Sequence, residues 1–136
     1  MLEKILAISG KPGLFRLISR GNRSLIVETL DTQKKRMPAF ASDKVISLAD
    51  IAMYTDAEEV PLRQVFKTIF ENEGGKKTTV DYKKASTAEL AAFMEKALPN
   101  YDRDHVYPTD MRKLIQWYNI LIENGITDFE EPNTAN

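Results

Sequence analysis

The chain of 136 residues contains no cysteine, a single histidine and no long apolar run. The absence of cysteine excludes disulfide frameworks, thiolate metal sites and a cysteine nucleophile, and it fits a reducing cytoplasm. No segment approaches the ~20 apolar residues of a membrane helix. The apolar stretch from Ile5 to Ile8 is also too short for a signal peptide. We therefore expect a cytoplasmic protein that does not engage a membrane.

Net charge is nearly absent as well, at −1, but the charges are unevenly divided. Residues 1–55 carry nine Lys/Arg and five Asp/Glu, a net of +4, whereas residues 56–136 carry ten and fifteen, a net of −5. The hydrophobic pattern changes at the same place, from β-like to helical. We predict a β module over 1–55, a three-helix module over 56–126 and a flexible tail over 127–136.

The first module contains short apolar or β-branched runs separated by turn signals. Five strands are predicted, over residues 5–8, 14–19, 24–30, 35–40 and 51–54, with one helical turn at 47–50. Pro38 places the fourth strand at an edge or beside a bulge, and Phe15 and Phe40 are expected to face inward. The pattern indicates a small β-barrel or bent antiparallel sheet, with a Src-homology-3-like barrel preferred. The whole chain is therefore predicted to be α+β.

The second module shows three amphipathic stripes at helical spacing. The first helix is expected to start near Pro61 and stop at Gly74, and the third to run from Pro108 to Gly125. The second helix opens with a capping box at Ser86 and Glu89. One shared helical core is expected to contain the following stripe residues: Phe66, Ile69, Leu90, Phe93, Leu114 and Tyr118.

Three stretches carry a resemblance to a known family. They are Leu2–Phe15, then Ser47–Ile51 with Tyr54 and Thr55, and Leu98–Tyr107 with the helix that follows. On these residues the chain resembles an uncharacterised bacterial family of two-part proteins known only as a domain of unknown function. The resemblance implies a β N-terminal part and a helical C-terminal part, and it implies no activity, substrate or cofactor.

The strongest candidate for a binding site is a group of cations in the β module. If the predicted turns lie side by side, these cations share one basic edge that could attract phosphate backbones. The alternative is charged edge protection. The candidate residues are Arg16, Arg20, Arg23, Lys34, Lys35 and Arg36. The nearby Gly10-Lys11-Pro12-Gly13 does not fit a phosphate loop, because Pro removes an amide and the segment leads into a strand.

The second candidate is a polar cluster around the single histidine. Asp102, Asp104, His105 and Asp110 could bind a divalent cation, but their spacing matches no known metal loop, and no nucleophile motif accompanies them. The alternative is that Asp102 and Asp104 shape a loop and Asp110 stabilises a helix N-terminus. We therefore assign no catalytic residue, no metal and no cofactor.

The aromatic residues of the second module have two interpretations. Trp117, Tyr118, Tyr101 and Tyr107 either belong to the core or, where exposed, form a partner-binding patch. The leading prediction is a non-enzymatic adaptor or protein-interaction module whose basic half meets an acidic or phosphate-bearing partner. The alternatives are a nucleic-acid-binding protein that uses the basic edge, and an enzyme built around His105. The sequence leaves the oligomeric state open.

Overall fold

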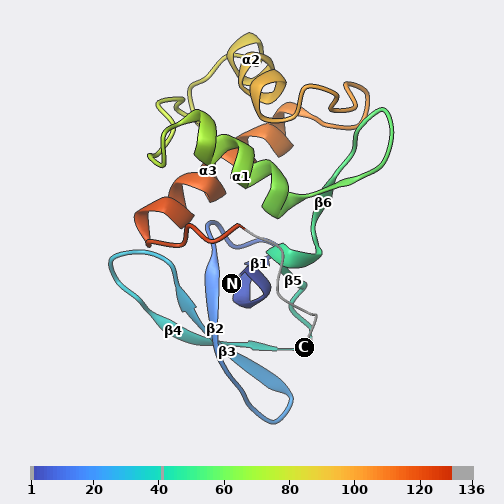
Figure 1. Ribbon diagram of the computed structural model, residues 1–136. Helices are drawn as coiled ribbons and strands as arrows, with labels where there is room; N and C mark the ends of the chain where they lie inside the picture. Colours follow the sequence, from blue (N-terminus) through green and yellow to red (C-terminus); the bar gives the residue numbers. More distant parts are fainter. Residues whose placement is uncertain (1, 41, 130–136) are drawn as a thin grey trace, which may run out of the picture.

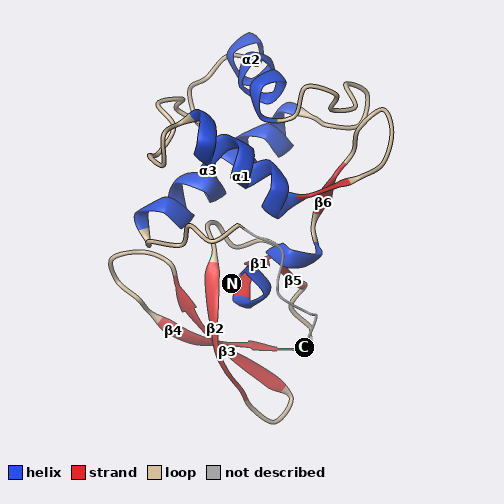
Figure 2. Ribbon diagram, viewed as in Figure 1, coloured by secondary structure: helices blue, strands red, loops and turns tan. Residues whose placement is uncertain are grey.

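The computed structural model describes residues 2–40 and 42–129 and has an α+β fold, as predicted. A five-stranded antiparallel sheet forms one half of the molecule and three helices form the other (Figures 1 and 2). Within the described ranges, no helix is long and apolar enough to span a bilayer.

The sheet consists of β1 (Ile5–Ile8), β2 (Phe15–Arg20), β3 (Ser24–Thr29), β4 (Arg36–Phe40) and β5 (Val45–Ser47), in the order β4-β3-β2-β1-β5. All neighbouring pairs are antiparallel. Across the part of the chain that is described, no ladder joins the edge strands β4 and β5. The bent antiparallel sheet is therefore confirmed, but it is not closed, and a Src-homology-3-like barrel is not confirmed.

The strand predicted over 51–54 lies outside the five-stranded sheet. Within 51–54, the strand β6 (Ala52–Met53) pairs with β7 (Val60–Pro61) in a separate two-stranded sheet. The fifth strand of the sheet is instead β5, which pairs with β1 and precedes the short 3₁₀ turn η2 (Leu48–Asp50). The hydroxyl of Ser47 donates to the backbone oxygen of Glu3 (3.0 Å) in η1 (Leu2–Lys4), which ties β5 to the chain start. A strand of three residues is too short to show an alternating pattern.

The two faces of the sheet pack into different apolar clusters, because successive side chains on a strand point to opposite faces. Ile5 joins the large core shared with the helices. The opposite face forms a smaller cluster of Leu6, Ile8, Phe15, Val27 and Ala39. Phe15 is thus buried as predicted. The prediction for Phe40 is wrong: Ala39 fills the cluster, and Phe40, on the other face, is 54% exposed.

The three helices are α1 (Leu62–Asn72), α2 (Thr87–Ala97) and α3 (Pro108–Glu123). The predicted capping box is present: Glu89 N donates to Ser86 Oγ (3.2 Å) and Ser86 N donates to the Glu89 carboxylate (3.4 Å). Gly125 follows α3 with a φ of +70°, a conformation that side chains other than glycine rarely adopt. Local signals therefore define the helix ends.

The large core contains five of the six predicted residues: Phe66, Ile69, Leu90, Leu114 and Tyr118. Phe93 is only partly buried, and its neighbour Met94 is fully buried in its place. The same core includes sheet-side residues such as Leu2, Leu14 and Leu48, so it is continuous across residue 55. Whether the two predicted modules fold separately stays a prediction.

Of the predicted tail, only residues 127–129 are described; the remainder of that prediction, 130–136, lies outside the described residues. Phe129 is 2% exposed. Its ring centroid lies 5.7 Å from that of Phe66 and 5.8 Å from that of Phe70 on α1. This contact secures the chain beyond α3 to the helical core.

Candidate functional site

The basic residues of the β module are divided between two ends of the sheet. Arg20 and Arg23 flank the β2–β3 turn, whereas Lys34 and Lys35 lie in the β3–β4 turn. These turns are at opposite ends of β3, about 20 Å apart for a strand of this length. The two turns therefore do not lie side by side, and the six cations do not form one compact patch.

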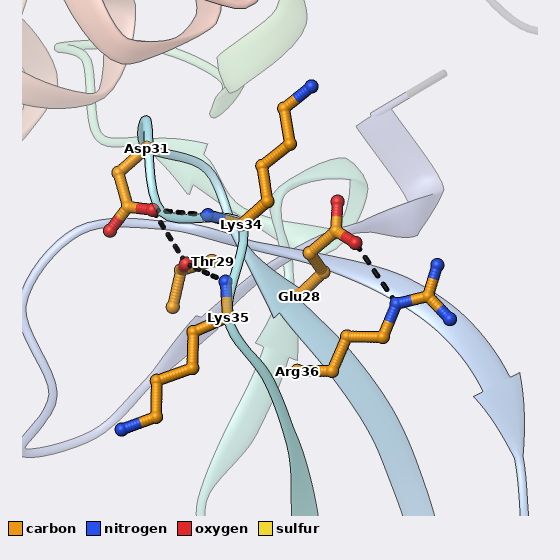
Figure 3. Close-up of polar contacts among 6 residues, drawn as sticks. All are labelled: Glu28, Thr29, Asp31, Lys34, Lys35 and Arg36. Atoms are coloured by element: carbon orange, nitrogen blue, oxygen red, sulfur yellow. Dashed lines mark hydrogen bonds and ion pairs between the residues drawn. The ribbon is translucent and has the colours of Figure 1, made fainter.

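The β3–β4 turn is held by a network of hydrogen bonds around Asp31 (Figure 3). The Asp31 carboxylate accepts from the Thr29 hydroxyl (2.7 Å) and from the Lys34 amide (3.0 Å), and Lys35 N donates to Thr29 Oγ1 (2.9 Å). The Thr29 hydroxyl, followed by the backbone amides, lowers the pKa of Asp31. The side chains of Lys34, Lys35 and Arg36 point in different directions (Figure 3). Several hydrogen bonds hold the turn, but its cations do not converge.

Arg16 and Arg36 lie on either side of a carboxylate. Arg16 is in register with Glu28 on β3, which is in register with Arg36 on β4. Arg36 Nε lies 3.1 Å from Glu28 Oε2. One acidic residue thus offsets part of the charge of this arginine pair.

A surface hollow lies at the opposite end of the sheet. Its volume is about 410 Å³, and its walls include Arg20, Arg23, Asp43 and Phe40. Phe40 therefore places an exposed aromatic ring in the same hollow as two arginines. This arrangement was not expected, because Phe40 was predicted to face inward.

The Asp/His cluster forms a turn that precedes α3. The Asp102 carboxylate contacts His105 Nδ1 (2.7 Å) and accepts from the backbone amide of Asp104 (2.9 Å). The hydrogen bond with His105 is the main cause of the lowered pKa of Asp102. Asp102 N also donates to Tyr54 O (3.0 Å), which ties the turn to the segment after β6. These contacts give Asp102 a clear structural role.

Asp110 is occupied at the start of α3, where its carboxylate accepts from Tyr107 N (2.9 Å). A carboxylate at this position also interacts favourably with the helix dipole. Among the residues that the structure describes, no three His, Asp or Glu side chains are grouped so that they could hold a metal ion. The cluster therefore consists of a histidine–aspartate pair and a helix cap.

Two adjoining hollows lie along α3, and together we call them the seam groove. The first, the anchor hollow, has a volume of about 220 Å³ and lies between β6, the start of α1 and α3. The second, the lysine hollow, has about 550 Å³ and lies between the loop 9–13, β5 and α3. Lys113 and Trp117 line both hollows. The groove thus runs where the sheet half meets the helical half.

The lysine hollow is basic although the whole chain is slightly acidic. Lys11, Lys44 and Lys113 line it, and none of the described residues in its wall is Asp or Glu. The rest of the wall includes partly buried Trp117 and Ile46, which is 45% exposed. Lysines around an apolar wall favour an anionic ligand that also has apolar groups.

Sequence reasoning found this groove only in part. The loop with Lys11 was identified as a turn, and Trp117 was identified as a possible partner contact if exposed. Lys44 and Lys113 were missed, because they lie far apart in the sequence, in segments that the fold alone brings together. Tyr101 and Tyr118 are buried, and Tyr107 is 57% exposed but outside both hollows.

Both halves of the chain are similar to known proteins. Residues 51–121 match the family described as Domain of unknown function (DUF6852), and residues 2–48 match Domain of unknown function (DUF5606). A solution NMR structure of a structural-genomics target from Bacteroides vulgatus is 59% identical, with a TM-score of 0.78, over 100% of this chain and 96% of that one. No curated protein matched. The two-part resemblance predicted from the sequence is confirmed.

Proposed function

The chain belongs to the family described as Domain of unknown function (DUF6852), and since this description names no activity, we propose a function from the geometry. The protein is a non-enzymatic interaction module that binds an acidic segment of a partner protein in the seam groove. The observation that carries the proposal is the lysine hollow, which is lined by Lys11, Lys44 and Lys113 beside apolar side chains and by no carboxylate among the described residues. Its location in the cytoplasm stays a prediction from the sequence.

Charge complementarity explains why the partner should be acidic. Lysines that line one hollow attract an anionic segment during encounter, although the net charge of the whole chain is −1. Partly buried Trp117 adds apolar contact area, and tryptophan is among the residues that contribute most at protein interfaces. An acidic segment with apolar side chains matches both properties of the wall.

An enzyme is a weaker interpretation of the same groove. His105 does line the anchor hollow, together with Asp110 and Lys113. However, no described serine, threonine or cysteine lines this hollow, and Asp110 already caps α3. A nucleophile paired with the histidine, as acyl transfer requires, is not assembled here.

The test compares two pairs of lysines in the full chain. The groove variant carries Lys44→Gln and Lys113→Gln, and the control carries Lys34→Gln and Lys35→Gln, which removes the same charge from the β3–β4 turn. Partners are captured from native cell extract after nuclease treatment and identified by mass spectrometry. Affinity for a synthetic acidic segment of a captured protein is then measured.

We expect the groove variant to bind about fivefold to thirtyfold more weakly and the control to bind like the wild type, because each charge pair at such a surface contributes about 0.5–1 kcal/mol. The affinity should fall as salt is added. Equal binding by the groove variant and the wild type would contradict the proposal.

Nucleic acid is a second candidate, favoured by one observation at the other end of the sheet. Phe40 is an exposed aromatic in the same hollow as Arg20 and Arg23, and single strands bind by base stacking together with phosphate contacts. Binding of a fluorescent oligonucleotide should weaken with salt, with a log–log slope near −0.7 for each phosphate contact. Replacing Arg20 and Arg23 by Gln should reduce that slope. No binding at low salt would remove this candidate.

A further inference from the structure

We propose that the partner segment carries one large apolar side chain that enters the anchor hollow, next to the acidic residues that lie over the lysine hollow. This inference rests on the proposed function and specifies which segments the module recognises. The anchor would be a leucine, methionine or phenylalanine.

The floor of the anchor hollow is apolar and already formed. Met53, Leu62, Val106 and Leu114 line it and are at most 8% exposed. The backbone around it is secured, since Leu62 N donates to Ile51 O (2.9 Å). A preformed floor does not have to be ordered on binding, so an apolar side chain that covers it loses little affinity to reorganisation.

The polar groups of this hollow are few. They are Tyr54, His105, Asp110 and Lys113. Tyr54 is 53% exposed, and its ring lies edge-on to His105, with 6.0 Å between the ring centroids. Exposed tyrosines beside an apolar pocket are typical energetic centres of interfaces.

The size of the hollow favours a side chain over a whole ligand. Its volume of about 220 Å³ is below the ~300–1,000 Å³ of most small-molecule sites. A ligand that only partly enters must continue outside the hollow. The lysine hollow offers the continuation, because it shares Lys113 and Trp117 with the anchor hollow.

The shared residues also mean that one short segment can reach both hollows. Lys113 and Trp117 are four positions apart on α3, about 6 Å along the axis. An extended peptide advances about 3.3 Å per residue, so acidic side chains a few positions from the anchor can reach the adjoining lysine hollow. The recognised segment therefore combines one apolar residue with nearby acidic residues, a pattern that peptides can test.

The experiment uses wild-type protein and labelled synthetic peptides at low salt, with binding read from fluorescence anisotropy. The probe is a glutamate-rich peptide with one central leucine. In one matched peptide alanine replaces the leucine, and in another glutamine replaces every glutamate. Because the protein is unchanged, the comparison does not depend on whether a variant folds.

We expect the alanine peptide to bind at least about tenfold more weakly, because the apolar burial of the anchor is lost. Tyr54→Ala should weaken binding of the leucine peptide, whereas Tyr107→Ala, which removes an equally exposed tyrosine outside both hollows, should not. If the leucine and alanine peptides bind with equal affinity, and that binding still requires the glutamates, this inference is overturned and the proposed function stands. Binding of the glutamine peptide as tightly as the probe would overturn the proposed function, and no binding of any peptide would overturn both.

Discussion

Two neighbouring residues of α2 should respond very differently to truncation. Met94 is fully buried in the large core, whereas Phe93 only packs against its border. Phe93 also lines a surface hollow with Val80 and Lys96, so one side of its ring already borders solvent. Met94→Ala and Phe93→Ala therefore test which of the two positions faces the core.

The magnitudes follow from burial. Removing a buried methionine side chain costs about 2–5 kcal/mol, because apolar contacts are lost and a closed cavity remains. Full burial of a large apolar side chain stabilises a protein by about 1.5–3 kcal/mol. Phe93 is only partly buried, so Phe93→Ala should lower the free energy of unfolding by about 1–2 kcal/mol. The Phe93 site opens to the surface, and no closed cavity adds to that loss.

Equilibrium unfolding in urea measures both losses. The signal is far-ultraviolet circular dichroism, and the slope of stability against urea should be unchanged in both variants. Met94→Leu, a change that nearly conserves volume, is the control and should cost less than about 1.5 kcal/mol. Equal losses, or a larger loss for Phe93→Ala, would refute the placement of these two side chains.

Three further changes test other contacts. The Tyr118 hydroxyl donates to Lys76 O (2.6 Å), so Tyr118→Phe should cost about 1–2 kcal/mol in urea unfolding. Burial, and then the charge of Glu73, raises the pKa of Tyr118 to about 12. The free energy of unfolding of the wild type should therefore fall more steeply between pH 10 and 12 than that of Tyr118→Phe. Parallel curves of stability against pH would contradict this. The folded state lowers the pKa of Asp31 from its usual value of 3.8, so the ionised carboxylate stabilises the fold above that value. This stabilisation is lost as the pH falls further, and acid unfolding of Asp31→Asn should therefore depend less steeply on pH than that of the wild type. Phe129→Ala should lower the free energy of unfolding by about 3–5 kcal/mol, and a loss below 1 kcal/mol would show that this ring does not belong to the core.

The helices could be predicted because their ends depend on nearby residues. Ser86 and Glu89 satisfy backbone donors within one turn, and Gly125 supplies the left-handed conformation after α3. Each signal lies within a few residues of the structure it specifies. The helical stripes likewise identified most of the core, since their period is a local property of the sequence.

The errors occurred where the fold depends on contacts between distant segments. β5 has only three residues, and it is specified by its pairing with β1 some 40 positions earlier. Phe93 and Met94 both fit the stripe of α2, and only the packing of α2 against α1 and α3 decides which one is central. For Phe40 the error was one of register, because a shift by one residue moves a side chain to the other face of the sheet.

In the candidate site, residues that are adjacent in the sequence do not converge in space, and residues that converge in space are distant in the sequence. Lys34, Lys35 and Arg36 are adjacent in the sequence, yet their side chains diverge in space, and Glu28 pairs with the arginine (Figure 3). Lys44 and Lys113 lie far apart in the sequence, yet the fold places both in the wall of one hollow. A run of charges in a turn therefore need not converge, whereas single charges from separate elements can line one hollow. The two lysine pairs carry equal charge, so the difference in affinity between their variants measures the effect of position and not of net charge.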